Sequence, residues 1–198
     1  MTDLVERRDL DQVYQPAEDS RLLAETAAER VGDGDLVLDV GTGSGHVAAV
    51  AEDAGADVVG VDLNPLACRD ARDSGIPVVQ ANLTDPFRDG VFDAVLFNPP
   101  YLPTPPEDER DDWMEYALSG GEDGRAVIEP FLDGVGRVLA PAGRVLLLVS
   151  TLTGLDAVVE YAAKRGLSAE EVAAESHPFE RLVVLALVPG RSTDETTN

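Results

Sequence analysis

Four consecutive residues, Asn98-Pro99-Pro100-Tyr101, directly follow the apolar segment 92–97 and could bind a substrate. The apolar segment is typical of a buried strand, and prolines cannot continue the hydrogen-bond ladder of a sheet. Asn98 is therefore expected at the carboxyl end of a strand, where open α/β sheets bind ligands. Because the prolines have no backbone N–H, Asn98 Oδ1 and the Pro99 carbonyl would present mainly acceptors. Such a turn suits a substrate with an –NH2 group, although an Asn-Pro turn can also simply end a strand.

A glycine-rich loop supplies a second group of candidate residues. The apolar run 36–40 leads into Gly41-Thr42-Gly43-Ser44-Gly45, and a helical pattern begins at His46. A strand, a glycine loop and a helix together form a common nucleotide-binding arrangement, because glycines let the backbone approach the ligand and the helix N-terminus presents free N–H groups. The spacing is G-x-G-x-G with Asp39 two residues ahead, whereas dinucleotide sites need G-x-G-x-x-G. This form indicates S-adenosylmethionine rather than NAD.

Three further residues are expected beside the same cleft. A second apolar run ends in Asp62, about 20 residues after the first glycine, a spacing at which an acid binds a ribose hydroxyl. Asn82 and Leu83 follow the short strand predicted over 76–80. His46 begins the helix after the glycine loop, but no neighbour in the sequence would orient it as a base, so we expect a surface or packing role.

The segments that must position these residues alternate between strand and helix patterns, as in a doubly wound α/β sheet. Helices are predicted over about 16–27, 46–51, 65–74, 125–139 and 155–165, and strands over 36–40, 58–61, 76–80, 92–97, 143–149, 169–175 and 181–188. Pro77 favours a sheet edge for the strand over 76–80. The stretch 102–119 is rich in proline and acids and long for a structureless connection, which predicts a binding loop.

The chain length and residue content indicate one domain without a metal. The 198 residues suit a single domain over 1–189, followed by a disordered polar tail over 190–198. There is no run of about 18 apolar residues and no charged-then-apolar leader, so we expect a cytoplasmic protein without a membrane span or signal peptide. Cys68 is the only cysteine, and His46 and His177 are the only histidines. They offer neither an internal disulfide nor a plausible zinc cluster.

The charge of the chain is unusual. There are 38 Asp and Glu residues against 15 Lys and Arg residues, a net charge of −23, and Lys164 is the only lysine. This composition is typical of proteins that work in molar salt, where charges are screened within about 3 Å, and it predicts a halophilic source. A second interpretation is that the acidic surface repels nucleic acid and attracts a basic partner.

Together these motifs resemble the class I S-adenosylmethionine-dependent methyltransferases. More narrowly, the chain is similar to the HemK-related glutamine N5-methyltransferases of peptide-chain release factors, in their short eukaryotic and archaeal form. The resemblance covers about residues 14–188 and rests on Tyr14-x-Pro16-Ala17-Glu18-Asp19-Ser20, Asp39-Val40-Gly41-Thr42-Gly43-Ser44-Gly45, Asp62-Leu63-Asn64-Pro65, Asn98-Pro99-Pro100-Tyr101 and Gly120-Gly121-x-x-Gly124-Arg125. It departs at Asn82, where the family commonly has an aspartate, but asparagine keeps an acceptor oxygen.

The resemblance implies a function and a site. It implies N5-methylation of the glutamine in the Gly-Gly-Gln loop of a release factor, on a seven-stranded, mostly parallel Rossmann-like sheet with an antiparallel closing strand. The implied catalytic residues are Asn98, Pro99, Pro100 and Tyr101. The implied S-adenosylmethionine contacts are Pro16, Ser20, Asp39, Gly41, Thr42, Gly43, Gly45, Asp62, Leu63, Asn82, Leu83 and Asn98. The family also implies a small zinc-binding activator subunit, which we expect on the edge strand 76–80.

Other functions fit part of the pattern. An N-methyltransferase acting on the exocyclic amino group of adenine or guanine would use the same acceptors after base flipping, but the sequence has no basic groove for nucleic acid. A non-catalytic cofactor-binding scaffold is a different class, and the intact Asn98 and glycine loop argue against it. A lysine methyltransferase activity stays open.

Overall fold

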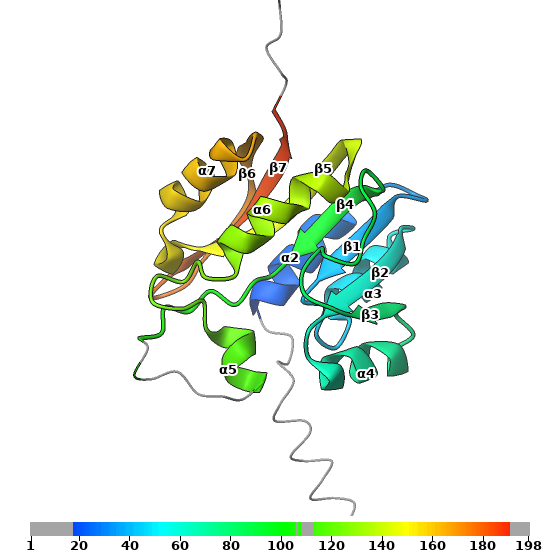
Figure 1. Cartoon of the computed structure of the whole chain (residues 1–198), viewed down its shortest axis with the longest axis horizontal. Coiled ribbons are helices and arrows are strands. Elements are labelled where there is room, and N and C mark those ends of the chain that lie inside the picture. The colour runs from blue at the N-terminus through cyan, green and yellow to red at the C-terminus, as the bar shows by residue number, and fades with distance from the viewer. Residues whose placement is uncertain (1–17, 106, 108–112, 191–198) are drawn as a thin grey trace, which may run out of the picture.

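The computed structural model describes residues 18–105, 107 and 113–190 (Figure 1). Seven strands form one sheet in the order β3-β2-β1-β4-β5-β7-β6. The strands are β1 Leu36–Val40, β2 Asp57–Asp62, β3 Val78–Gln80, β4 Phe92–Phe97, β5 Leu139–Ser150, β6 Leu167–Ser176 and β7 Arg181–Pro189. The helices are α2 Glu18–Ala28, α3 His46–Asp53, α4 Pro65–Asp73, α5 Trp113–Leu118, α6 Ile128–Val138 and α7 Leu155–Lys164, with a 3-10 turn, η1, over Thr151–Thr153.

The pairing of the strands confirms the predicted fold class. β1 pairs in parallel with β2 and β4, and the parallel pairs β2–β3 and β4–β5 extend the sheet on either side. β7 runs antiparallel to both β5 and β6, so it is the antiparallel closing strand. β3 lies at one border of the sheet, as Pro77 predicts, and β6 lies at the other.

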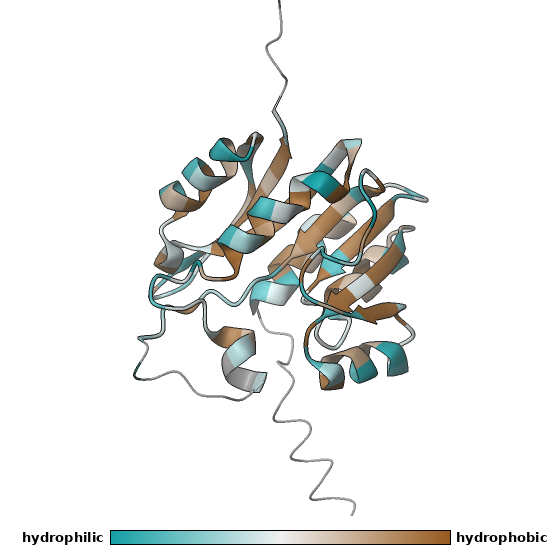
Figure 2. Ribbon diagram, in the orientation of Figure 1, coloured by the Kyte–Doolittle hydropathy of each residue, from teal (hydrophilic) through white to brown (hydrophobic). Residues whose placement is uncertain are grey.

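Helices cover both faces of the sheet, with α6 and α7 on the near face in Figure 1 and α2 and α3 on the far face. Alternate residues of β4 serve the two sides: Val95 and Phe97 belong to the core beneath α6 and α7, whereas Ala94 and Leu96 belong to the core beneath α2 and α3. Figure 2 shows the central strands as almost uniformly hydrophobic. A parallel strand buried on both faces has this continuous apolar pattern, which is why the sequence located β4 correctly.

Some predicted boundaries are wrong, and long-range contacts explain the one at the start of β5. β5 begins at Leu139 rather than Gly143, because Leu139 already pairs with Phe92 before a register shift, and regular pairing resumes at Arg144 opposite Ala94. A Cβ at Gly143 would lie 2.6 Å from the Phe92 carbonyl oxygen, so this close approach needs glycine.

Other boundaries differ through local turns. β3 begins at Val78 rather than residue 76, and α6 begins at Ile128 rather than residue 125. The predicted loop 102–119 contains the short helix α5, and η1 was not predicted. The expected helix start near residue 16 and the expected disorder over 191–198 cannot be compared, because these residues lie outside the described ones. Within the described residues, no helix combines the length and apolar character needed to cross a bilayer.

Candidate active site

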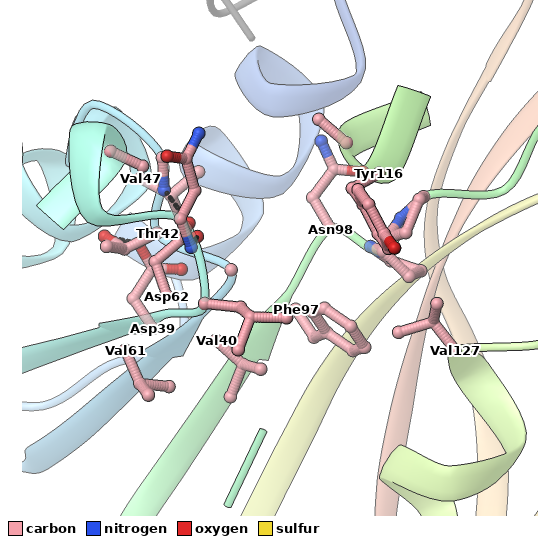
Figure 3. Close-up of a pocket in the computed structure, with 18 of the residues that line it drawn as sticks. Asp39, Val40, Thr42, Val47, Val61, Asp62, Phe97, Asn98, Tyr116 and Val127 are labelled. Carbon is pink, nitrogen blue, oxygen red and sulfur yellow. Dashed lines mark hydrogen bonds between the residues drawn. The ribbon is translucent and has the colours of Figure 1, made fainter. Parts of the chain in front are cut away.

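A cavity of about 500 Å³ lies at the carboxyl edge of the central strands. It has two sides, and Figure 3 shows Asp39, Thr42 and Asp62 on one and Asn98 and Tyr116 on the other. The predicted residues that line it are Ser20, Asp39, Gly41, Thr42, Gly43, Asp62, Leu63, Asn82, Leu83, Asn98, Pro99, Pro100 and Tyr101. Parallel strands bring their carboxyl ends to one sheet edge, so segments far apart in the chain meet here.

Two buried acids hold the glycine loop in place. The Thr42 hydroxyl donates to Asp39 Oδ2 at 2.7 Å, and the Gly43 N–H donates to Asp62 Oδ2 at 2.9 Å. Gly43 has a φ of 56°, in the left-handed region that favours glycine, and this conformation accompanies the contact of its N–H with Asp62. The two carboxylates near the ends of β1 and β2 therefore determine the position of the loop.

Burial is the main influence on both acids. It raises the pKa of Asp39 from its ordinary 3.8 to about 7, although hydrogen bonds from Thr42 and the Ala48 backbone oppose the shift, while the neighbouring Asp62 adds to it. Burial also raises the pKa of Asp62, against backbone hydrogen bonds from Asn64, Gly43 and Leu63. A cationic ligand in the pocket would favour the ionised form of both carboxylates.

Asn98 is held by one end of its side-chain amide. Its Nδ2 donates to Ser20 Oγ at 3.2 Å, while Oδ1 is buried and has no hydrogen-bond partner in the described part of the chain. Phe97, Tyr116 and Val127 form apolar walls around this side of the cavity (Figure 3). The site therefore offers a dehydrated acceptor next to apolar surface, an arrangement that suits an N–H donor.

The segment after Asn98 is fixed by the Gly120–Arg125 element, a role that the sequence did not reveal. The Leu102 N–H donates to Leu118 O at 3.0 Å, and the Gly120 N–H donates to Leu102 O at 2.9 Å. A Cβ at Gly124 would lie 2.6 Å from Tyr101 O. Arg125 Nη1 donates to Thr153 O at 2.6 Å, which ties this element to the end of β5. The element was part of the family resemblance, but only the structure shows that it holds the segment after Asn98 in position.

The other residues singled out in the sequence have different positions relative to the cavity. Gly45 is not among the pocket-lining residues and lies at the N-terminus of α3, where its backbone has a φ of 87°. Pro16 lies outside the described residues. His46 is exposed as expected and also borders the cavity. Leu83 has a φ of 46°, the one positive value among the described non-glycine residues, and strain of this kind often accompanies a ligand site.

Sequence reasoning missed the wall that α5 contributes. Trp113 and Tyr116 line the cavity, and their ring centroids are 5.8 Å apart. The three-residue spacing of these aromatics within a proline- and acid-rich stretch was the available signal. The described residues contain no group of three or more His, Cys, Asp or Glu side chains that could hold a metal ion.

Comparisons with known proteins agree with this geometry. A family profile described as a methyltransferase domain matches residues 38–99. A Methanocaldococcus jannaschii protein, provisionally named a protein N5-glutamine methyltransferase, is 35% identical over 181 residues, which cover 88% of this chain and 90% of the relative. The human protein called methyltransferase HEMK2 is 32% identical, with 87% of this chain and 88% of the relative covered. This chain belongs to the HemK-related protein N5-glutamine methyltransferase family.

A solved structure has a fold similar to that of this methyltransferase. The E. cuniculi Mtq2-Trm112 complex, described as responsible for methylation of the eRF1 translation termination factor, contains a chain that is 28% identical, with a TM-score of 0.74. The match covers 89% of this chain and 98% of that one. Nearly the whole methyltransferase fold is therefore shared.

The pocket fits the cofactor of this methyltransferase, S-adenosylmethionine. Asp62 accepts the backbone N–H of Asn64 at Oδ1 and that of Gly43 at Oδ2, and with about four lone-pair sites its carboxylate could also accept a ribose hydroxyl. Asp39 adds a second buried carboxylate for a cationic ligand. When bound, the cofactor supplies a methyl group on a positively charged sulfur. The contacts of individual residues to it stay predictions.

The raised pKa of Asp39 predicts a pH-dependent stability. Between about pH 4 and pH 7 the folded protein retains a proton that the unfolded chain has lost, so the wild type should lose stability as the pH rises through this window. Asp39→Asn removes this dependence, and its stability relative to the wild type should rise from pH 5 to pH 7 and then level off. Denaturant unfolding at constant salt, without cofactor, would measure the difference. Parallel curves would show that Asp39 is ionised throughout.

Gly124→Ala should damage transfer while sparing the cofactor. The backbone of Gly124 has a φ of 75°, and the added Cβ would displace Tyr101 O or Thr153. Misplacement of a site by about 1 Å can cost on the order of 100-fold in rate. We expect turnover to fall at least about 10-fold, with cofactor affinity within a few-fold, by steady-state kinetics and calorimetry. Gly136→Ala, in α6 with open space around it, is the matched control and should retain normal turnover.

Proposed function

We propose that this methyltransferase transfers a methyl group to N5 of the glutamine in the Gly-Gly-Gln loop of a class-1 peptide-chain release factor. The observation that carries the proposal is Oδ1 of Asn98 at the end of β4, which is buried beside a cofactor-sized cavity and has no hydrogen-bond partner among the described residues. The M. jannaschii relative is named for glutamine N5 methylation, and the Mtq2 complex is named for methylation of eRF1. Both names support the substrate assignment.

Asn98 and Pro99 address the chemical difficulty of the reaction. A glutamine nitrogen is a poor nucleophile because its lone pair is conjugated with the carbonyl, the same conjugation that gives amides a rotation barrier of about 18–20 kcal/mol. In the proposed complex Asn98 Oδ1 and the Pro99 carbonyl accept the two N–H groups of the substrate amide. They fix its orientation and stabilise the positive charge that grows on nitrogen.

The surroundings of Asn98 strengthen this effect. Phe97 is buried, and with Tyr116 and Val127 it gives the substrate side apolar walls. Hydrogen bonds act more strongly where such walls exclude water. No strong general base is required, because methylation itself acidifies the nitrogen, which can then lose its proton to solvent.

The rival functions have less support. A nucleic-acid substrate would have to approach a chain of net charge −23, in which basic residues are few. A non-catalytic scaffold would have no need for the buried Asn98 Oδ1, which has no partner among the described residues and costs about 1–3 kcal/mol while nothing donates to it. A glutamine side chain needs no basic surface for its recognition, and its amide N–H groups suit the acceptor at Asn98.

We infer that a small zinc-binding activator subunit forms a heterodimer with this chain at the β3 edge. The Mtq2 relative is found in a complex with Trm112, which supports such a partner. β3 has only three residues and lies at the border of the sheet, where unpaired backbone groups can accept another strand. Val79 is 37% exposed and Leu63 is 49% exposed, and Gln80 Nε2 donates to Leu63 O, which brings the two segments together.

Composition and function support two further proposals. We propose a cytoplasmic location, since release factors act in translation. We also propose a halophilic source, which the excess of 38 acidic over 15 basic residues supports.

Asn98→Ala tests the proposed reaction. Because Asn98 Oδ1 is proposed to act on the substrate amide, its loss should lower transfer on the order of 100- to 1000-fold while cofactor affinity stays within a few-fold. The substrate is a release factor incubated with labelled cofactor, and mass spectrometry locates the added methyl group. A release factor with alanine in place of the target glutamine is the control and should stay unlabelled. Near-normal turnover by Asn98→Ala would contradict the role of this residue.

Val79→Asp tests the position of the activator. A charge on the β3 edge should dissociate the pair, seen in co-purification and analytical ultracentrifugation, and leave cofactor binding by the isolated chain measurable. Val188→Asp is the matched control, because Val188 is 43% exposed but lies in β7, away from the β3 edge. A complex indifferent to Val79→Asp would place the interface elsewhere.

A further inference from the structure

We propose that Asp19 and Ser20 set the hydrogen-bonding polarity of Asn98 and thereby make the pocket selective for a substrate that presents an N–H group. The two residues act as positioning residues, through Asn98. The inference rests on the proposed glutamine methylation and deepens it. It gives the first turn of α2 a role in choosing an amide over a carboxylate.

Three side chains form a continuous chain of hydrogen bonds. Asn98 Nδ2 donates to Ser20 Oγ at 3.2 Å, and Ser20 Oγ donates to Asp19 Oδ1 at 3.4 Å. The backbone N–H of Ser20 also donates to Asp19 Oδ1, at 2.6 Å, which holds the carboxylate in place. Asp19 and Ser20 are 6% and 7% exposed, so water does not readily replace either of them. The chain runs from the start of α2 to the end of β4.

The direction of this chain follows from the chemistry of its members. An ionised carboxylate only accepts hydrogen bonds, and a hydroxyl has a single proton to donate. With its proton directed to Asp19, Ser20 Oγ presents lone pairs to Asn98. The Nδ2 end of the Asn98 amide fits this position, whereas Oδ1 would meet another acceptor there. Asp19 therefore fixes the direction of the Ser20 hydroxyl, and Ser20 in turn fixes which end of the Asn98 amide faces it.

The consequence for the substrate is a choice between donors and acceptors. With Nδ2 held by Ser20, Asn98 keeps Oδ1 as the group without a partner in the described structure. A rotated Asn98 amide would instead present N–H groups, which repel a substrate –NH2 and attract a carboxylate. Glutamine and glutamate side chains have nearly the same shape, so shape alone distinguishes them poorly. The orientation of one amide can distinguish them.

The position of α2 explains how the chain stays aligned. The helix buries Leu22, Leu23 and Ala27 in the same core as Leu96 of β4. Two elements of one packed core thus hold the two ends of the Ser20–Asn98 contact. Exposed side chains could not keep the alignment equally well, because each would exchange its partner with water.

Ser20→Ala and Ser20→Thr form a matched pair for the test, since neither changes the net charge. The protein is the complex with its activator, saturated with S-adenosylhomocysteine for binding and with S-adenosylmethionine for turnover. Two release-factor peptides serve as probes, one with Gly-Gly-Gln and one with Gly-Gly-Glu. Calorimetry gives the ratio of their affinities for each variant.

The wild type should prefer the Gln peptide by at least about 10-fold, because Asn98 Oδ1 repels a carboxylate. Ser20→Ala frees the Asn98 amide to rotate, so at saturating cofactor the preference should fall about 10-fold and turnover at least about 10-fold. Ser20→Thr keeps the hydroxyl and should restore both. Asp19→Asn lets residue 19 donate to Ser20, and turnover should fall in the same direction.

Two results would overturn the inference. One is Ser20→Ala with an unchanged Gln to Glu preference, whatever its turnover, since a merely structural role changes stability and not polarity. The other is Ser20→Thr behaving like Ser20→Ala. A wild type that methylates no release-factor glutamine would instead overturn the proposed function, and the peptide-affinity ratio would still decide the role of Ser20.

Discussion

The site depends on one constraint, the burial of an amide oxygen without a partner. Asn98 Oδ1 is such an atom within the part of the chain that the structure describes, and an unsatisfied acceptor costs about 1–3 kcal/mol. Asn98 cannot easily move to relieve this cost, because β4 is buried on both faces and paired on both edges. Its Nδ2 is bound to Ser20, and Gly124 packs against Tyr101 three residues later. The fold thus keeps this acceptor in place, and in the proposed complex, binding of the substrate amide would recover the cost.

A second constraint lies on the cofactor side of the cavity, where two carboxylates are buried near each other. Asp39 and Asp62 lie near the carboxyl ends of neighbouring parallel strands, and burial raises the pKa of both. Their hydrogen bonds to Thr42 and Gly43 also shape the glycine loop, so the same carboxylates determine loop geometry and negative charge. A cationic ligand would stabilise the ionised acids and hence the loop conformation that depends on them. Binding of the cofactor and order in the loop are expected to be coupled for this reason.

The sequence predicted the parts of this arrangement that depend on local pattern. β1, β2 and β4 were located because continuous apolar runs mark parallel strands, and the glycine loop and Asp62 were found through their spacing. The contacts that complete the site were out of reach. Ser20 and Asn98 are 78 residues apart, and no local pattern pairs them. The close approaches of Gly124 to Tyr101 and of Gly143 to Phe92 likewise arise only when distant segments meet.

The surface charge has little influence on the chemistry of the buried site. The 38 acidic residues give a net charge of −23, but in molar salt such charges are screened within about 3 Å, so they influence a buried amide little. Salt also weakens ionic contacts between subunits, while many salts strengthen apolar burial. An interface at the β3 edge that used backbone pairing with β3 and burial of the exposed Val79 side chain would therefore tolerate salt better than one held by ion pairs. On this argument, acidification of the surface can proceed without rebuilding either the catalytic pocket or the proposed activator edge.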